Sequence, residues 1–270
     1  RRWGHAPTSC GRDEVTRALH LLALLAVNAV PAAGWFVEGW SAGTTLVVYW
    51  FENVAVCLFV SARIVAHRRW SPRRGHFKYQ APKSDRRGAQ TSFLSGFLVT
   101  SLVFSAAHGV FLGVVLFMLN HNDQSGVAAV DWHHVGSGCV RLLVILAIDF
   151  VVDLPGLRRW SFWQIEQTAN RSLGRIAVVH LTLVLGMLGA AMTDASALFG
   201  VFVVLKTLYA LSMALPQWEP TTPPKWLSRV MNRLPNVHQG EGFEESWADE
   251  RADEAERRDE NERPWTGARR

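Results

Sequence analysis

Cysteine is scarce in this chain of 270 residues, which holds only Cys10, Cys57 and Cys139. Their number is odd and their spacing matches no metal-binding pattern, so the sequence predicts neither a disulfide framework nor a cysteine-ligated metal. The chain also lacks a glycine-rich phosphate loop, a nucleophile elbow and a metalloprotease helix motif. These absences leave no motif-based support for an enzyme, and the sequence predicts no catalytic residue and no cofactor.

Charged residues are rare in six apolar blocks that fill most of the chain. About 20 apolar residues, at 1.5 Å per residue, span the hydrocarbon core of a bilayer as a helix. Only helices are expected, because the bilayer core offers no water to an open backbone. The sequence therefore predicts an all-α integral membrane protein with six transmembrane helices, at about 15–35, 42–65, 92–119, 136–154, 175–193 and 197–215.

Lys and Arg are absent from alternate connections between these blocks. The connection 66–91 carries eight of them, the 155–174 connection has three arginines, and the N-terminus has Arg1, Arg2 and Arg12. The connections near 36–41, 120–135 and 194–196 have none. By the positive-inside rule both termini are cytoplasmic. The first block also resembles a signal peptide, with small residues at Ala32 and Ala33, but its apolar character continues past them and favours a retained helix.

The remaining segments are polar. Residues 1–14 are expected to form a cytoplasmic N-terminal segment before the transmembrane domain, 15–215. Residues 216–237 read as a juxtamembrane segment with a short amphipathic helix at 225–234, suited to the membrane surface. Residues 238–270 mix acids with arginines and have few apolar residues, which predicts a charged tail that is disordered or at most a frayed helix.

Several ionisable residues interrupt the apolar blocks, and a charge there costs about 2.5 to 3.5 kcal/mol on insertion scales. Glu52 lies about 15 Å into the second block and Lys206 about 14 Å into the sixth, so the two are level and are expected to pair. Other polar residues lie at neighbouring depths, toward either end of the predicted helices. The sequence thus predicts a buried polar seam that contains Tyr49, Glu52, Asn53, His108, Arg141, Asp149, His180 and Lys206.

The seam leaves three functions open. Intramembrane ionisable groups favour a proton or ion path, hence proton- or ion-coupled transport of a small solute. A network that only fixes helix register would suit a non-catalytic scaffold or assembly factor. A metal- or haem-dependent membrane enzyme is the third reading; its candidate metal ligands are His121, His133 and His134, and its candidate haem ligands are His108 and His180.

Partners follow from surface features. Ser101, Ser105, Gly109 and Gly113 recur every four residues and form a small-residue stripe, which packs helices closely inside the bundle or in a homo-oligomer. Basic residues of the 66–91 connection and the 225–234 helix are expected to contact the lipid bilayer through anionic headgroups, not nucleic acid. We expect the protein in the cytoplasmic (plasma) membrane of a prokaryote.

The stretch "VVYWFEN", residues 47–53, resembles the Leu-Tyr-Trp-x-Glu-Asn signature of an uncharacterised family of small polytopic membrane proteins, a domain of unknown function. "RIAVVHLTLVLG", 175–186, is similar to a later Arg-x4-His helix of that family, and "VLKTLY", 204–209, to its Lys-Thr element. The resemblance implies no activity, substrate or cofactor. It does add Arg175 to the seam residues, beside Tyr49, Glu52, Asn53, His180 and Lys206.

Overall fold

The computed structural model describes residues 9–82, 92–121, 125–190, 208, 220, 222–233 and 242–267, and within these ranges the regular structure is helical. Five long helices form a bundle, and shorter helices lie in the connections and the tail. The long helices are α1 (Ser9–Phe36), α2 (Ala42–Trp70), α3 (Phe93–His121), α5 (Trp132–Leu157) and α6 (Phe162–Ala190); the others are η1 (Arg74–His76), α4 (Ser125–Ala128), α8 (Lys225–Met231) and α9 (Phe243–Glu262).

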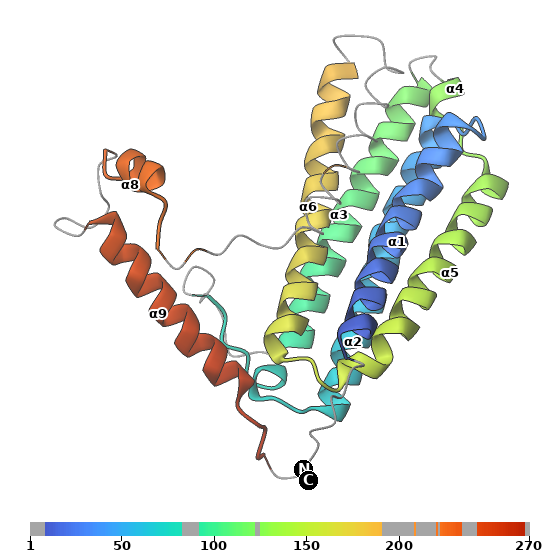
Figure 1. Ribbon diagram of the computed structural model, residues 1–270. Helices are drawn as coiled ribbons and strands as arrows, with labels where there is room; N and C mark the ends of the chain where they lie inside the picture. The colour runs from blue at the N-terminus through green and yellow to red at the C-terminus, as the bar shows by residue number, and fades with distance from the viewer. Residues whose placement is uncertain are drawn as a thin grey trace.

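The long helices stand side by side and alternate in direction (Figure 1). α2 lies at the centre of the bundle, in contact with α1, α3, α5 and α6. The end of the bundle where α2 ends and η1 follows carries Arg68, Arg69, Arg73 and Arg74, and we call it the basic end. The other end, with the α1–α2 turn and α4, we call the opposite end.

Local sequence fixes where helices begin at the opposite end. Ser41 caps α2 by accepting a hydrogen bond from the backbone N–H of Thr44, and Asp131 caps α5 by accepting from His133 and His134. The backbone N–H of His134, and then that of His133, keep the pKa of Asp131 below its usual value. Gly39 takes a left-handed conformation with φ of 68°, which turns the chain between α1 and α2.

Two apolar clusters hold the bundle together, one toward each end. Toward the opposite end, residues of α1, α2 and α5 pack around Trp40, which is 3% exposed and lies on Gly34. Toward the basic end, residues of α2, α3, α5 and α6 pack around Phe162. A smaller cluster of Leu46, Tyr49 and Leu112 joins α2 to α3.

The outside of the bundle is apolar as well. Large hydrophobic side chains are exposed along α1, α3 and α5, such as Leu22, Val110 and Val144. A soluble protein rarely leaves so much apolar surface in water. Four helices in the described part of the chain are long and apolar enough to cross a membrane: Ala18–Phe36, Ala42–Trp70, Phe93–Met118 and Trp132–Leu157.

The predicted blocks agree with these four helices to within a few residues, but the start of α6 differs. α6 begins at Phe162, well before the predicted 175, because its first turns pack Phe162 and Ile165 into the cluster at the basic end. The predicted block 197–215 lies outside the described residues, apart from Leu208. The predicted topology of the termini is not tested by this arrangement.

The tail differs more from its prediction. Residues 243–262, expected as part of a disordered tail, form α9, whose C-terminal end packs against η1 and the start of α6 (Figure 1). Arg257 donates to Glu254 at i−3 and Arg258 donates to Glu254 at i−4, which supports the helix locally. Specific contacts with the bundle stabilise α9, whose charged composition alone does not predict a stable helix.

Candidate functional site

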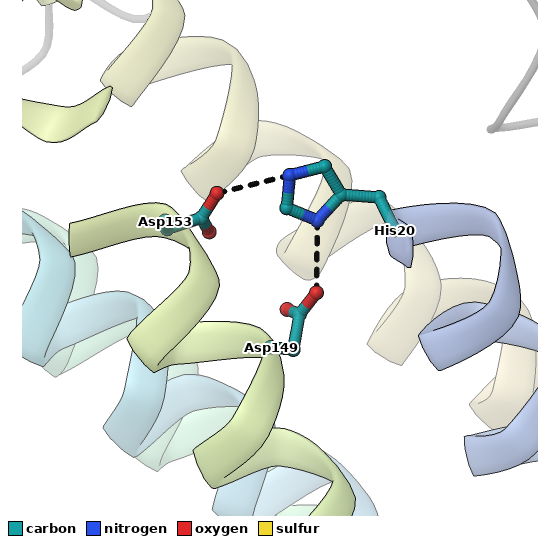
Figure 2. A group of neighbouring side chains, drawn as sticks. All are labelled: His20, Asp149 and Asp153. Atoms are coloured by element: carbon teal, nitrogen blue, oxygen red, sulfur yellow. Dashed lines mark hydrogen bonds and ion pairs between the residues drawn. The ribbon is translucent and has the colours of Figure 1, made fainter. Parts of the chain in front are cut away.

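Four ionisable side chains meet between α1, α2 and α5 near the basic end. His20 extends from α1 between Asp149 and Asp153, which lie one turn apart on α5 (Figure 2). Its Nδ1 is 2.9 Å from Asp149 Oδ1, and its Nε2 is 3.1 Å from Asp153 Oδ1. From α2, Arg63 donates through Nη2 to Asp149 Oδ2 at 2.6 Å and through Nε to Asp153 Oδ2 at 2.7 Å. We call His20, Arg63, Asp149 and Asp153 the tetrad.

The tetrad is buried on one side only. The Arg63 and Asp153 side chains are 7% and 5% exposed, whereas His20 and Asp149 are 35% and 22% exposed. Arg63 is held further by the ring of Phe150, 5.6 Å from its guanidinium carbon. Arg63 is therefore the buried anchor of the tetrad, and His20 is its accessible edge.

The tetrad contains the one group of side chains in the described part of the chain that could hold a metal ion. Ligand atoms of His20, Asp149 and Asp153 lie within 4.8 Å of one another. A histidine with two carboxylates suits a divalent transition metal. However, Arg63 already neutralises one of the two carboxylate charges, and each ring nitrogen of His20 already contacts a carboxylate oxygen.

A second charged group lies about a third of the way along α2, where Glu52 pairs with Arg175 of α6. Glu52 is completely buried and the Arg175 side chain is 14% exposed. Glu52 is ten residues into α2, about 15 Å from its start, and Arg175 is thirteen residues into α6, about 20 Å from its start. Because Glu52 is completely buried, removing Arg175 would leave an uncompensated and costly charge.

Neutral polar groups surround this central pair. Tyr49, Asn53 and Cys57 follow one another at i, i+4 spacing on α2, and each is nearly fully buried. The Trp50 indole of α2 donates to the Ser105 carbonyl of α3 at 2.9 Å, and the Cys57 thiol lies near Ser101 of α3 and Ser172 of α6. These contacts place the polar stretch of α2 against both α3 and α6.

Three of these buried groups have no hydrogen-bond partner among the residues that the structure describes: the Asn53 amide and the hydroxyls of Ser105 and Ser172. Asn53 is 2% exposed and Ser105 is 4% exposed. A buried amide or hydroxyl without a partner costs about 1 to 3 kcal/mol. Buried polar groups of this kind commonly hold an ordered water or a polar ligand.

The seam residues predicted from the sequence fall into separate places. Glu52, Asn53, Tyr49, His108 and Arg175 lie in the middle of the bundle. Asp149 belongs to the tetrad. Arg141 lies at the opposite end, where its guanidinium is 2.6 Å from Glu38 and lowers the pKa of that carboxyl; the Arg141 side chain is 47% exposed, not buried as its depth suggested.

The predicted pairing of Glu52 with Lys206 involves a residue outside the described part of the chain. The side chain of His180 also lies outside the described part. The partner of Glu52 that the structure describes is Arg175. Sequence reasoning missed three tetrad members as a group: His20, Arg63 and Asp153. Their signal was available, because Arg63 is a cation inside a predicted span and Asp149 and Asp153 have the i, i+4 spacing of one helix face.

The other predicted residues have ordinary surroundings. Gly109 lies against the Trp50 indole of α2, so this part of the small-residue stripe packs inside the bundle, whereas Gly113 faces open space. His133 and His134 follow the Asp131 cap, and His134 stacks on Trp40 with ring centroids 6.0 Å apart. His121 stacks on Phe117. These histidines do not share a metal-capable group within the described residues.

At the basic end, α9 is fastened by buried charge. Glu166 of α6 accepts from Tyr79 Oη at 2.6 Å and from Arg257 Nη1 at 2.7 Å. Arg257 is 6% exposed and also donates to the Gln80 carbonyl. Burial raises the pKa of Tyr79 well above its usual value, so Tyr79 remains a hydrogen-bond donor. Glu262 accepts from the Phe162 backbone N–H, at the first residue of α6.

Two arginines of the basic connection, expected at lipid headgroups, instead face the tail. Arg74 pairs with Glu260, and Arg73 Nε is 3.4 Å from Glu262. Nearby, Arg68 lies over the Phe77 ring at 4.4 Å. The positive charge of η1 is thus largely balanced by the acids of α9.

Comparison with known proteins identifies the family but not an activity. No curated protein and no solved structure matches the chain. A family model described as a family of unknown function (DUF6498) matches residues 12–225, which include the bundle, the tetrad and the central pair. The chain therefore belongs to this family of unknown function, DUF6498.

Proposed function

We propose that this protein is a proton-coupled transporter of a small polar solute, working from within the membrane. The observation that carries the proposal is the ion pair between Glu52, which is completely buried, and Arg175, whose side chain is 14% exposed, on the neighbouring helices α2 and α6. An ionisable residue inside a membrane span is costly and is retained where an ion, a proton or a polar solute passes. The apolar exterior of the bundle supports the membrane setting.

The groups beside the pair fit a solute with polar functions. Arg175 offers donors to an anionic or carbonyl group, and Glu52 offers acceptors to a cationic or hydroxyl group. The Asn53 amide and the Ser105 hydroxyl add neutral donors and acceptors at the same depth. A polar solute that bound these groups would offset their burial and would compete with the Glu52–Arg175 contact, which gives the helices a second arrangement.

The proposal includes six spanning helices with both termini in the cytoplasm of a prokaryotic cell. The basic end then faces the cytoplasm, where cationic connections are favoured. α8 would lie on the inner membrane surface, since Trp226 and Val230 are 62% and 51% exposed. Cysteines placed at Lys78 and Val37 in a Cys-free background should react from the cytoplasmic and the outer side respectively; reaction from one side only would contradict this orientation.

Transport can be tested without a known substrate. Purified protein is reconstituted in liposomes that contain a pH-sensitive dye, and amino acids, sugars, carboxylates and inorganic anions are added in turn. We expect one class to drive proton flux in the native protein, with at least a tenfold loss in Glu52→Gln. Glu38→Gln, which breaks the exposed pair with Arg141, should retain the flux and is the matched control. Absence of flux with every class would refute the transporter.

A membrane scaffold is the second candidate, and α9 favours it. α9 is anchored at its C-terminal end, while acids in its first turns, Glu244 and Glu245, are exposed. A scaffold would need this surface and not the central pair. Loss of the cellular phenotype on removal of residues 242–270, with no loss in Glu52→Gln, would favour the scaffold over the transporter.

A further inference from the structure

The position of His20 between two carboxylates has a consequence for its protons. Both ring nitrogens contact an ionic oxygen, Nδ1 toward Asp149 and Nε2 toward Asp153 (Figure 2). An ionised carboxylate only accepts hydrogen bonds, and a neutral imidazole has a single N–H to donate. Both contacts can therefore be hydrogen bonds only if the histidine carries a proton on each nitrogen, or if one carboxyl carries a proton itself.

The charge count gives the same answer by a separate route. Arg63 contacts the remaining oxygen of each carboxylate and supplies one positive charge against two negative ones. One further proton brings the tetrad to zero net charge. A zero net charge is what a site among apolar helices requires, because an uncompensated charge there is costly.

We infer that the tetrad is a binding site for one proton, held between His20, Asp149 and Asp153 and balanced by Arg63. Among the described residues of the helices packed on His20, three titratable or charged groups face it. They are Arg63 from α2 and Asp149 and Asp153 from α5. Glu38 and Arg141, the other ion pair near α1 and α5, pair with each other at the opposite end.

The exposures place His20 at the surface of the bundle, near the basic end. Its side chain is 35% exposed, while Arg63 and Asp153 are buried behind it. Loss of the proton would weaken the contacts of His20 with Asp149 and Asp153, which join α1 to α5. The contact between α1 and α5 is thus linked to protonation. As the coupling step of transport, this linkage rests on the proposed function; as a proton site, it does not.

The first test measures the proton directly. The chain has ten histidines, so the His20 signals in ¹⁵N spectra of the full-length protein in nanodiscs are assigned by difference from His20→Gln. At neutral pH we expect both His20 nitrogens to show the protonated, imidazolium shift. A neutral His20 with one bare nitrogen, bound to carboxylates that are both ionised, would overturn the inference without any further variant.

Variants then test the partners. In Asp149→Asn the tetrad needs no extra proton to be neutral, so the imidazolium signal of His20 should be lost at neutral pH; Glu38→Gln should leave it unchanged. Persistence of the signal in Asp149→Asn would contradict the charge balance. Stoichiometric zinc chloride should also leave the native signal unchanged, and its replacement by a zinc-bound histidine shift would show a metal site instead of a proton site.

The outcomes separate this site from the proposed function. An imidazolium signal with no solute-driven flux in liposomes would keep the proton site and reject the transporter. Solute-driven proton flux that persists in His20→Gln would keep the transporter and reject the tetrad as its coupling site. Loss of flux in His20→Gln, with solute binding retained, is the result expected if both hold.

Discussion

The two charged groups on α2 solve the same physical problem differently. Glu52 and Arg63 are eleven residues apart, about three helical turns, and so lie on nearly the same face of α2. Glu52 is matched one to one by Arg175 and is completely buried. Arg63 is one cation against two carboxylates, with a histidine at the accessible edge. The central pair is balanced without a proton, whereas the tetrad is balanced only with one.

The difference suggests a division of roles along one helix. A group with a fixed charge balance keeps its state until a polar ligand competes for it. A group whose net charge is zero only when it binds a proton changes its charge with the pH around it. Because α2 carries both, movement at one level can reach the other through a single rigid element.

The largest effect is expected at the central pair. Arg175→Met leaves Glu52 uncompensated and should reduce the free energy of unfolding by about 3 to 5 kcal/mol. Glu52→Gln should be destabilising as well, and the double variant should recover much of the loss because no lone charge remains. Thermal and denaturant unfolding in detergent measure the cycle. Strictly additive losses would show that Arg175 is not the working partner of Glu52.

A smaller effect is expected at the tetrad. Arg63→Gln removes two charge-assisted hydrogen bonds, but His20 and partial exposure of Asp149 soften the loss, so we expect about 1.5 to 3 kcal/mol. The same unfolding measurements apply. Arg141→Gln is the matched control, because its pair with Glu38 is exposed, and it should be close to neutral. A larger loss in Arg63→Gln than in Arg175→Met would reverse the ranking of the two groups.

Packing around the central pair can be tested with two glycines of α3. In Gly109→Ala the new Cβ lies 2.9 Å from Trp50 Nε1, so the indole that bonds to Ser105 must shift, at a cost of about 1 to 3 kcal/mol. In Gly113→Ala the Cβ meets open space, and better helix propensity should stabilise by about 0.5 to 1 kcal/mol. Equal effects on melting temperature would indicate that α3 does not pack on Trp50.

The smallest effect is expected at His76, which is favoured in its neutral form, whereas His20 is inferred to be protonated. His67 Nδ1 is 2.8 Å from His76 Nε2, and His67 Nε2 donates to the Trp160 carbonyl, which holds η1 against the bundle. Burial lowers the pKa of His76 from 6.5 to about 3. The open state of η1 therefore binds more protons than the closed state between these values. The closed state is fully favoured above about pH 6.5 and is weakened as the pH falls toward about 3.

Hydrogen exchange of residues 71–80 measures this opening. Exchange, corrected for its intrinsic pH dependence, should increase as the pH falls below about 6.5 in the native protein. His76→Phe should remove that dependence, since phenylalanine keeps the aromatic contact with Phe162, whose ring centroid is 5.0 Å from that of His76, but does not titrate. The same pH response in His76→Phe would assign it to another group.

Much of the architecture could be predicted because it depends on local composition. Runs of apolar residues predict helices of spanning length, and the boundaries of α2 and α3 agree closely with those expected. The early start of α6 and the helix α9 were missed for one reason. Residues 162–174 and the α9 segment, Phe243–Glu262, are too polar for a hydropathy pattern to detect. They are held by long-range contacts such as Arg257–Glu166.

The site was predictable in its residues but not in its partners. Depth along each helix identified Glu52, Asp149 and His108 as intramembrane polar groups. Depth cannot say which helices are neighbours, so it chose Lys206 for Glu52 where the described structure has Arg175. Pairing depends on the rotation and contacts of helices, which a single-helix pattern does not contain.

The sequence by itself determined that this chain is helical, rich in membrane-type segments, and carries charges where they are costly. Those properties follow from side-chain hydrophobicity and backbone hydrogen bonding, which act within each segment. Only the tertiary structure decided that Arg63 joins two aspartates and a histidine while Arg175 joins Glu52. Charges in an apolar bundle are stabilised by what lies opposite them across a few ångströms, and that is fixed by packing between helices far apart in the chain.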